Sequence, residues 1–422
     1  MPHNGSALSC GRPVLLPSVD RRPPRVNYQT GGRRPRELER HPKRAPVSCS
    51  DGMDSSRDSR GIDVPESPCV AERSEKEEPC MESTTIAVDV AKEVLEVAVS
   101  IRPGQVSQQK RLSRTAFMKF CTDQPPATVL LEACGSAHYW ARRLQTLGHR
   151  VVLLPPHATR PYVFRNKTDR TDTRGLLEAY RNEDIHPVPV KSVSQQALTA
   201  LHRLRSTWLA ARTARLNTVR GLLREFGCII PVGAHHVLPR AWDLLADPDS
   251  GLPDALRPAL AEACTEIRQL EDRVRLVEHQ LEALADQTPA VARLRSIPGV
   301  GLITATALVA FVGDVQRFPS GRHFASYLGL TPREHSSGLI RRLGSISKRG
   351  DVYLRMLLTH GARAILWKAK SRPNPDRLRA WALQVQRLRG HNKAAIALAN
   401  KLARIVWAVW KHDVDFREVI AA

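Results

Sequence analysis

Short runs of aliphatic and β-branched residues in the first half of the chain alternate with segments of helical periodicity. Such runs are typical of buried strands. The expected strands are residues 84–90, 94–100, 127–134 and 150–154, and the expected helices are residues 114–121 and 138–147. Ser136 is expected to cap the second of these helices. Strands that alternate with helices predict an α/β layer.

Two long amphipathic segments follow, at residues 195–226 and 258–287. Apolar residues recur there at intervals of three and four with charged residues between them, as in a helical hairpin or a coiled coil. Residues 231–253, rich in Pro, Gly and Asp, connect the two segments. We expect a structural spacer or a dimerisation arm here. The later amphipathic helices are expected at residues 351–369, 376–389 and 392–410.

The charge of the chain points to a polyanionic partner. The 422 residues are enough for two or three domains, and 64 Lys and Arg against 42 Asp and Glu give a formal net charge of +22. Nucleic acid is the commonest polyanion for such a protein. No apolar run reaches the roughly 18 residues that a membrane span needs. The eight cysteines form no C-x-x-C pair, which argues against a zinc site or a disulfide framework and favours the cytoplasm.

Residues 1–80 differ in composition from the rest of the chain. They contain 11 of the 30 prolines and one aromatic residue. Such a segment cannot bury enough apolar surface to offset the entropy of ordering, so we expect it to be disordered. The composition changes at Met81, which we interpret as the natural start of the protein.

Four acidic residues stand where a metal site could form. Asp89 and Glu132 each lie at the end of an expected strand, while Asp169 and Asp172 are three residues apart at a helix start. Carboxylate oxygens at this density suit Mg²⁺ or Mn²⁺, and paired ions suit phosphodiester chemistry. Each acid taken alone can equally be a turn residue, a cap or a charge that favours a helix N-terminus.

The stretch 296–350 combines a glycine turn, a pair of serines and many cations. Its Ile-Pro-Gly-Val-Gly turn precedes an apolar segment, and Ser336 and Ser337 lie among arginines. A hydroxyl that attacks a phosphodiester needs cations, because negative charge grows on the non-bridging oxygens. A solvated Gly-rich loop is the alternative interpretation. The candidate phosphate-binding residues are Gly299, Gly301, Arg333, Arg341, Arg342, Lys348 and Arg349.

These motifs resemble the DEDD transposases of bacterial insertion sequences, also described as bridge-RNA-guided recombinases. The resemblance covers about residues 84–410. In the first half it rests on IAVDVAK, LLEACGSAHYWARRL and KTDRTDTRGLLEA. In the second half it rests on IPGVGLITATALVAFVGD, GLTPREHSSG and RRLGSISKRGD.

The resemblance implies an α/β domain of the ribonuclease H or RuvC type and an all-α remainder. The metal-binding tetrad would be Asp89, Glu132, Asp169 and Asp172. The helical C-terminal domain would begin with a helix-hairpin-helix-like unit, and its serine would become attached to DNA. Family position favours Ser337 over the adjacent Ser336, with Ser345 and Ser347 ranked lower. The expected parts are a tail (1–80), a RuvC-like domain (81–190), a coiled-coil spacer (191–290) and a serine domain (291–422).

The expected function is DNA strand exchange through a phosphoserine intermediate. The family also implies a non-coding guide RNA, which can carry sequence specificity by base pairing, and a homodimer or tetramer in the cytoplasm near the nucleoid. Two alternatives remain open from the residues. One is a metal-dependent RuvC-like junction nuclease that uses water. The other is a non-catalytic helix-hairpin-helix protein that grips DNA phosphates.

Overall fold

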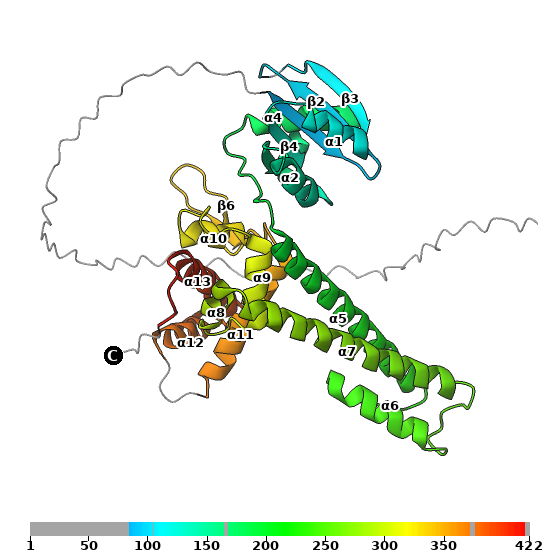
Figure 1. The fold of residues 1–422 in the computed structure, drawn as a ribbon. Helices are drawn as coiled ribbons and strands as arrows, with labels where there is room; N and C mark the ends of the chain where they lie inside the picture. Colours follow the sequence, from blue (N-terminus) through cyan, green and yellow to red (C-terminus); the bar gives the residue numbers. More distant parts are fainter. Residues whose placement is uncertain (1–83, 104, 164–167, 372–375, 418–422) are drawn as a thin grey trace, which may run out of the picture. The chain divides into compact units, whose positions relative to one another are not determined.

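A five-stranded mixed sheet forms the first folded part of the computed structural model, which describes residues 84–103, 105–163, 168–371 and 376–417. The strand order is β3-β2-β1-β4-β5, with β1 antiparallel to β2, β2 antiparallel to β3, and β4 parallel to both β1 and β5. The strands are β1 (Thr85–Val90), β2 (Val94–Ser100), β3 (Gln108–Ser113), β4 (Thr128–Glu132) and β5 (Arg150–Leu154) (Figure 1).

Helices cover both faces of this sheet. The helices of the region are α1 (Arg114–Thr122), α2 (Ala137–Gln145), α3 (Pro156–Thr159), η1 (Arg160–Tyr162) and α4 (Asp169–Tyr180). On one face, Phe117 of α1 and Trp140 of α2 pack in a T-shaped pair against Val88 and its neighbours. On the other face, Leu176 of α4 packs against Ala87 of β1. Successive strand residues alternate between these two cores.

The start of α2 differs from the expectation. Ser136 has φ 66° and ψ −7° and makes no capping hydrogen bond through its side chain. A capping serine needs extended backbone angles, and the left-handed conformation of Ser136 is incompatible with that role. The expected serine cap is therefore wrong, although the helix that follows it forms.

Two long helices make an antiparallel hairpin. They are α5 (Val193–Glu225) and α7 (Arg257–Asp286), joined through η2 (Ala234–His236) and α6 (Val237–Ala246). Three ion pairs bridge the helices, and residue numbers rise along α5 as they fall along α7: Arg205–Glu278, Arg212–Glu271 and Arg215–Glu266. The side chains of α6 close a separate apolar core at the turn of this hairpin (Figure 1).

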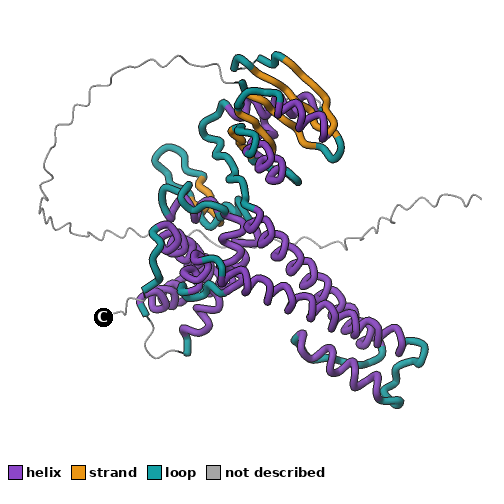
Figure 2. Tube along the Cα trace, viewed as in Figure 1, coloured by secondary structure: helices purple, strands orange, loops and turns teal. Residues whose placement is uncertain are grey.

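The C-terminal part is helical except for one short hairpin (Figure 2). Its elements are α8 (Pro289–Arg295), α9 (Leu302–Val312), α10 (Gly321–Tyr327), β6 (Pro332–Glu334), β7 (Leu343–Ile346), α11 (Val352–Ala369), α12 (Arg377–Arg389) and α13 (His391–Lys411). The helix α9 is apolar on all sides because it is the central helix of the core. His202 of α5 joins this core through contacts to Thr306 of α9 and Tyr353 of α11, each 3.1 Å long.

The expectation of an α/β part followed by a helical part is confirmed, while the coiled-coil and helix-hairpin-helix details stay predictions, as do the domain boundaries. The expected tail at 1–80 lies outside the described residues. The elements that were not expected include the polar edge strand β3, the helix α6 and the hairpin β6–β7. Among the residues with a described conformation, no helix is both long and apolar enough to cross a membrane.

Candidate functional site

Asp89 and Glu132 occupy neighbouring positions on two parallel strands. The pairing of β1 with β4 includes Val88 opposite Leu131, and the two acids are the next residue on each strand. Asp89 lies on the same side of the sheet as Ala87, and Glu132 on the same side as Leu130, since alternate residues share a face. That face is the one that α4 covers.

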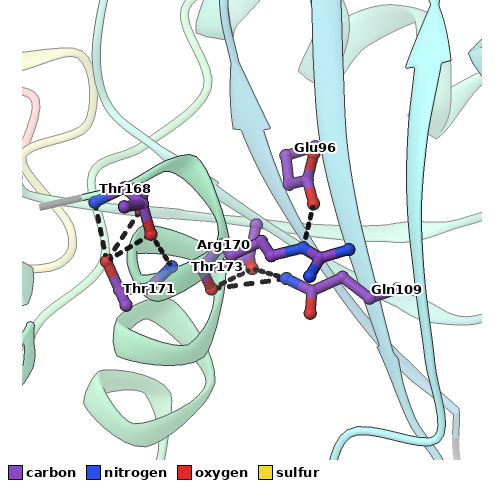
Figure 3. A network of polar contacts seen from close by, with 6 residues as sticks. All are labelled: Glu96, Gln109, Thr168, Arg170, Thr171 and Thr173. Carbon is purple, nitrogen blue, oxygen red and sulfur yellow. Dashed lines mark hydrogen bonds and ion pairs between the residues drawn. The ribbon is translucent and has the colours of Figure 1, made fainter.

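The helix α4 begins at the first of the two remaining acids. Thr168 and Thr171 form a reciprocal capping box, in which the Thr168 hydroxyl accepts from Thr171 N and the Thr171 hydroxyl accepts from Thr168 N (Figure 3). Asp169 and Asp172 both lie in the first turn, where the helix N-terminus favours negative charge. Asp89 and Glu132 therefore lie on the sheet face that α4 covers, and Asp169 and Asp172 lie at the start of that helix.

A tie between α4 and the edge strand fixes the helix on the sheet. The Gln109 side-chain amide of β3 donates to Arg170 O at 3.4 Å and to the Thr173 hydroxyl at 3.5 Å (Figure 3). Thr173 is fully buried. The strand β3 therefore positions the start of α4, which carries Asp169 and Asp172. The apolar pattern did not predict this strand.

Glu96 is an acidic residue of this site that sequence reasoning missed. It pairs directly with Asp89 across β1 and β2, so the two carboxylates share a face, and only 7% of its side chain is exposed. Arg170 of α4 lies 3.7 Å from it and offsets the charge (Figure 3). The sequence feature that could have identified Glu96 is its position as an acid in the middle of the otherwise apolar strand VLEVAVS.

The pKa of the Cys134 thiol reflects its burial and the charges of two of these acids, Glu132 and Asp89. Burial raises the pKa of the Cys134 thiol, and the negative charges of Glu132 and Asp89 raise that pKa further. The thiol is therefore held in its protonated form, which is a poor metal ligand and a poor nucleophile.

These carboxylates fit a divalent cation by their chemistry. Asp89 and Glu132 on the sheet and Asp169 and Asp172 at the start of α4 carry hard oxygen donors, the ligands that Mg²⁺ or Mn²⁺ takes. The part of the chain with assigned positions contains no group of three or more His, Cys, Asp or Glu side chains already close enough to hold an ion. The role of the four carboxylates as a metal-binding tetrad therefore stays a prediction.

Ser336 and Ser337 lie in the exposed hairpin β6–β7, where their hydroxyls differ. Ser337 exchanges two backbone hydrogen bonds of 3.2 Å with Ile340, so the chain reverses between them through Gly338, which has φ 56°. The Ser336 hydroxyl donates to Glu334 Oε1 at 2.7 Å and accepts from Arg342 N at 3.1 Å. Within the described residues, the Ser337 hydroxyl has no hydrogen-bond partner.

Cations surround the two serines. Arg341 lies 3.5 Å from Glu334, and Arg333 donates to the backbone oxygen of Ser347 at 3.2 Å. All five expected phosphate-binding cations are exposed: Arg333, Arg341, Arg342, Lys348 and Arg349. The hairpin and the residues that follow it thus present a hydroxyl and a set of solvated positive charges.

Two glycines allow close backbone contacts at the base of this hairpin. Gly329 and Gly350 have φ 71° and 77°, and a Cβ at either would overlap backbone atoms, those of Arg349 and of Tyr327 respectively. Arg355 of α11 donates to Leu328 O and Arg349 O, each at 3.0 Å. The hairpin is therefore fastened to α11 at its base.

The glycine turn before α9 has a packing role. A Cβ on Gly299, at φ 79°, would lie 2.8 Å from both Gly361 O and the Ile365 side chain of α11, so only glycine fits this close contact between the turn and the helix. Gly301 begins α9 as its N-cap, is exposed, and has open space around its Cα. The roles of Gly299 and Gly301 in binding DNA stay predictions.

Comparisons with known proteins agree on one family. A model of the DEDD transposase domain of the IS110 type, described as "Transposase", matches residues 86–227. A second, described as "Transposase IS116/IS110/IS902 family", matches residues 291–377. The first covers the acids and the second covers the serine hairpin.

Relatives align with this chain over most of its length and over most of their own. A probable family 20 transposase of Pseudomonas aeruginosa is 41% identical over 338 residues, 80% of this chain and 99% of the relative. The transposases of the insertion elements IS1111A of Coxiella burnetii and IS1328 of Yersinia enterocolitica are each 36% identical over 79% of this chain, covering 91% and 98% of their own lengths. The sequence resemblance is thereby confirmed, and the chain belongs to the IS116/IS110/IS902 family of transposases.

Proposed function

We propose that this transposase cuts and rejoins DNA through a covalent bond between Ser337 and the scissile phosphate. The observation that carries the proposal is the difference between the two serines. The Ser336 hydroxyl is held by Glu334 and Arg342, whereas that of Ser337 has no partner among the described residues and lies at an exposed turn. A hydroxyl without a partner is available for attack.

In the proposed step, Ser337 Oγ attacks the phosphorus and forms a P–O bond as the sugar oxygen departs. The serine loses its proton and the leaving oxygen gains one, so the number of phosphodiester bonds is unchanged. A hydroxyl of a second strand then attacks the same phosphorus, and serine is released with its proton restored. Arg333, Arg341 and Arg342 would offset the charge that grows on the non-bridging oxygens.

The acids of the sheet would hold a divalent cation. A bound Mg²⁺ or Mn²⁺ supplies Lewis-acid polarisation of a phosphoryl oxygen or of an attacking hydroxyl. Asp89, Glu132, Asp169 and Asp172 would hold it, and Arg170 would keep the neighbouring Glu96 neutralised so that this fifth acid does not compete. The capping box at Thr168 keeps the two α4 acids in the first helical turn.

The proposal extends to the partners. DNA follows from membership in a transposase family, and the net charge of +22 supports binding to more than one nucleic-acid strand. We propose that a non-coding RNA guides the protein and that it acts as a dimer or tetramer. Loss of DNA integration after ribonuclease treatment, with restoration by RNA that copurifies with the protein, is the expected result.

The test of the serine is a search for a protein–DNA adduct on a denaturing gel, using element-end DNA. Wild type and Ser336→Ala are expected to form the adduct, and Ser337→Ala is expected to form none. Cleavage by Ser337→Ala at the wild-type rate would instead favour the water-using nuclease. No adduct and no cleavage by wild type, together with DNA binding that Asp89→Asn leaves unchanged, would favour a protein that only binds DNA.

A further inference from the structure

A cavity of about 920 Å³ lies under the serine hairpin, and nothing in the proposed chemistry uses it. Its walls come from the base of β6–β7 and from α12 and α13. Pockets of roughly 300–1,000 Å³ that mix an apolar floor with a few polar groups are typical ligand sites. Here Trp381 and Ile396 supply the apolar wall.

One face of α13 supplies the polar wall. Lys393, Asn400, Lys401 and Arg404 line the cavity at intervals of one, three and seven residues, which places them along the same side of the helix. Lys393 is in the first turn, where the helix N-terminus adds to its positive charge. The cavity therefore has a positive strip beside an aromatic surface.

The cations of this strip lack acidic partners. Across the described parts of the chain, Lys393, Lys401 and Arg404 take part in no ion pair with a carboxylate. Lys401 Nζ instead lies 4.3 Å from the centre of the Trp381 ring. Burial lowers the pKa of Lys401, and the charges of Arg377 and Arg404 lower that pKa further. An anion in the cavity would relieve this repulsion.

Asn400 adds a group that can meet a base edge. Its Nδ2 donates to Leu330 O at 3.1 Å, which ties α13 to the segment that leads into the hairpin. Its Oδ1 has no hydrogen-bond partner in the described structure and remains an acceptor. An aromatic ring, an amide acceptor and cations in one cavity form a set that suits a nucleotide.

We propose that this cavity binds one unstacked nucleotide of the DNA strand that the serine hairpin engages. The base takes the place of the Lys401 ammonium over the Trp381 ring, stacks on that ring and faces Asn400, and its phosphate lies against Lys393 and Arg404. The inference rests on the proposed function, because the strand is brought there by the hairpin that carries Ser337. Holding one nucleotide out of the stack would fix the register of the strand on the hairpin.

The variant Trp381→Leu tests the stacking, because leucine keeps an apolar side chain and removes the ring. Trp367 of α11, 76% exposed, gives the matched control Trp367→Leu. Affinity for a fluorescein-labelled oligothymidine is measured by anisotropy at low salt, with the full-length protein. Because stacking of a base on one aromatic ring contributes to binding affinity, Trp381→Leu is expected to weaken binding by about 10-fold. Trp367→Leu is expected to change the affinity by less than about 2-fold.

A second measurement locates the contact. Oligodeoxynucleotides that carry 5-iodouracil are cross-linked by light to the wild-type protein, and the modified peptide is identified by mass spectrometry. We expect the cross-link on Trp381 of α12. Equal affinity of the three proteins, or a cross-link confined to peptides outside the cavity, would overturn the proposal. A loss in Trp381→Leu limited to an RNA oligomer of the same sequence would also overturn it, in favour of guide RNA.

The serine variant separates this inference from the proposed mechanism. Ser337→Ala is expected to bind oligothymidine as wild type does and to show the same cross-link, since it keeps the cavity. If Ser337→Ala still forms the covalent adduct, the mechanism fails while the cavity result stands. If the adduct depends on Ser337 and the Trp381 ring contributes nothing to binding, the cavity inference alone fails.

Discussion

The buried His202 makes the stability of the helical core depend on pH. Its ring is 1% exposed and lies between Thr306 and Tyr353, both 3.1 Å away. Burial, followed by the positive charge of Arg205, lowers the pKa of His202 from 6.5 to about 4. The folded core therefore holds the neutral ring, with one nitrogen donating and the other accepting.

The sign of the effect follows from that pKa. The unfolded chain binds a proton near pH 6.5 and the folded chain does not until about pH 4, so stability is fully present above pH 6.5 and is lost as the pH falls towards 4. With these two values, the contribution of His202 between pH 7.5 and pH 5 changes by about 2 kcal/mol. This part of the chain should thus open about 30-fold more often at the lower pH.

Hydrogen–deuterium exchange read by mass spectrometry measures this opening in peptides of α9 and α11, after correction for the intrinsic rates at each pH. His202→Gln removes the titrating ring, so its loss of protection from pH 7.5 to pH 5 should be smaller than that of wild type by about 2 kcal/mol. The control is His279→Gln, an exposed histidine on α7. An equal loss in wild type and in His202→Gln would refute the reasoning.

Other predictions test the packing, the hairpin and the acids. Gly361→Ala should destabilise the C-terminal core by about 2 kcal/mol in urea unfolding, because its Cβ would overlap the backbone of the turn before α9. Arg212 Nε donates to Glu271 Oε1 at 2.7 Å between half-buried side chains, and a double-mutant cycle of alanine variants should give a coupling energy of about 1 kcal/mol. Asp89→Asn should weaken Mn²⁺ binding, measured by titration calorimetry, by at least about 10-fold, while the exposed Asp123→Asn should leave it unchanged.

The apolar pattern predicted the buried strands β1, β2 and β5 but missed the edge strand β3 and the helix α6. The runs at β1, β2 and β5 were found within one residue of their ends, because each is buried among aliphatic side chains. The edge strand β3, with the sequence QQKRLS, has no such pattern. It pairs with a neighbouring strand along one edge only, and most of its side chains are exposed. The helix α6 lies in a segment whose prolines and aspartates are typical of loops.

Some residues of the candidate site could likewise be predicted from the sequence, and others could not. A strand-end position and a helix start pointed to Asp89 and Asp172 without knowledge of the fold, because those places recur in sheets covered by helices. Glu96 was not identified, since its importance depends on a pairing across strands and on Arg170, 74 residues later. The choice between Ser336 and Ser337 also depends on hydrogen bonds that no spacing encodes.

In the proposed mechanism, Ser337 needs an activating group from outside the hairpin. A serine hydroxyl is weakly nucleophilic unless a base or a cation activates it. Glu334, the acid of the hairpin strands, is already engaged by the Ser336 hydroxyl at 2.7 Å and by Arg341 at 3.5 Å. The positive charges of the hairpin can stabilise a phosphate but cannot remove a proton. In the proposed mechanism, activation of Ser337 would come from another part of the chain or from a second copy, and Asp89, Glu132, Asp169 and Asp172 are the groups that we propose for it.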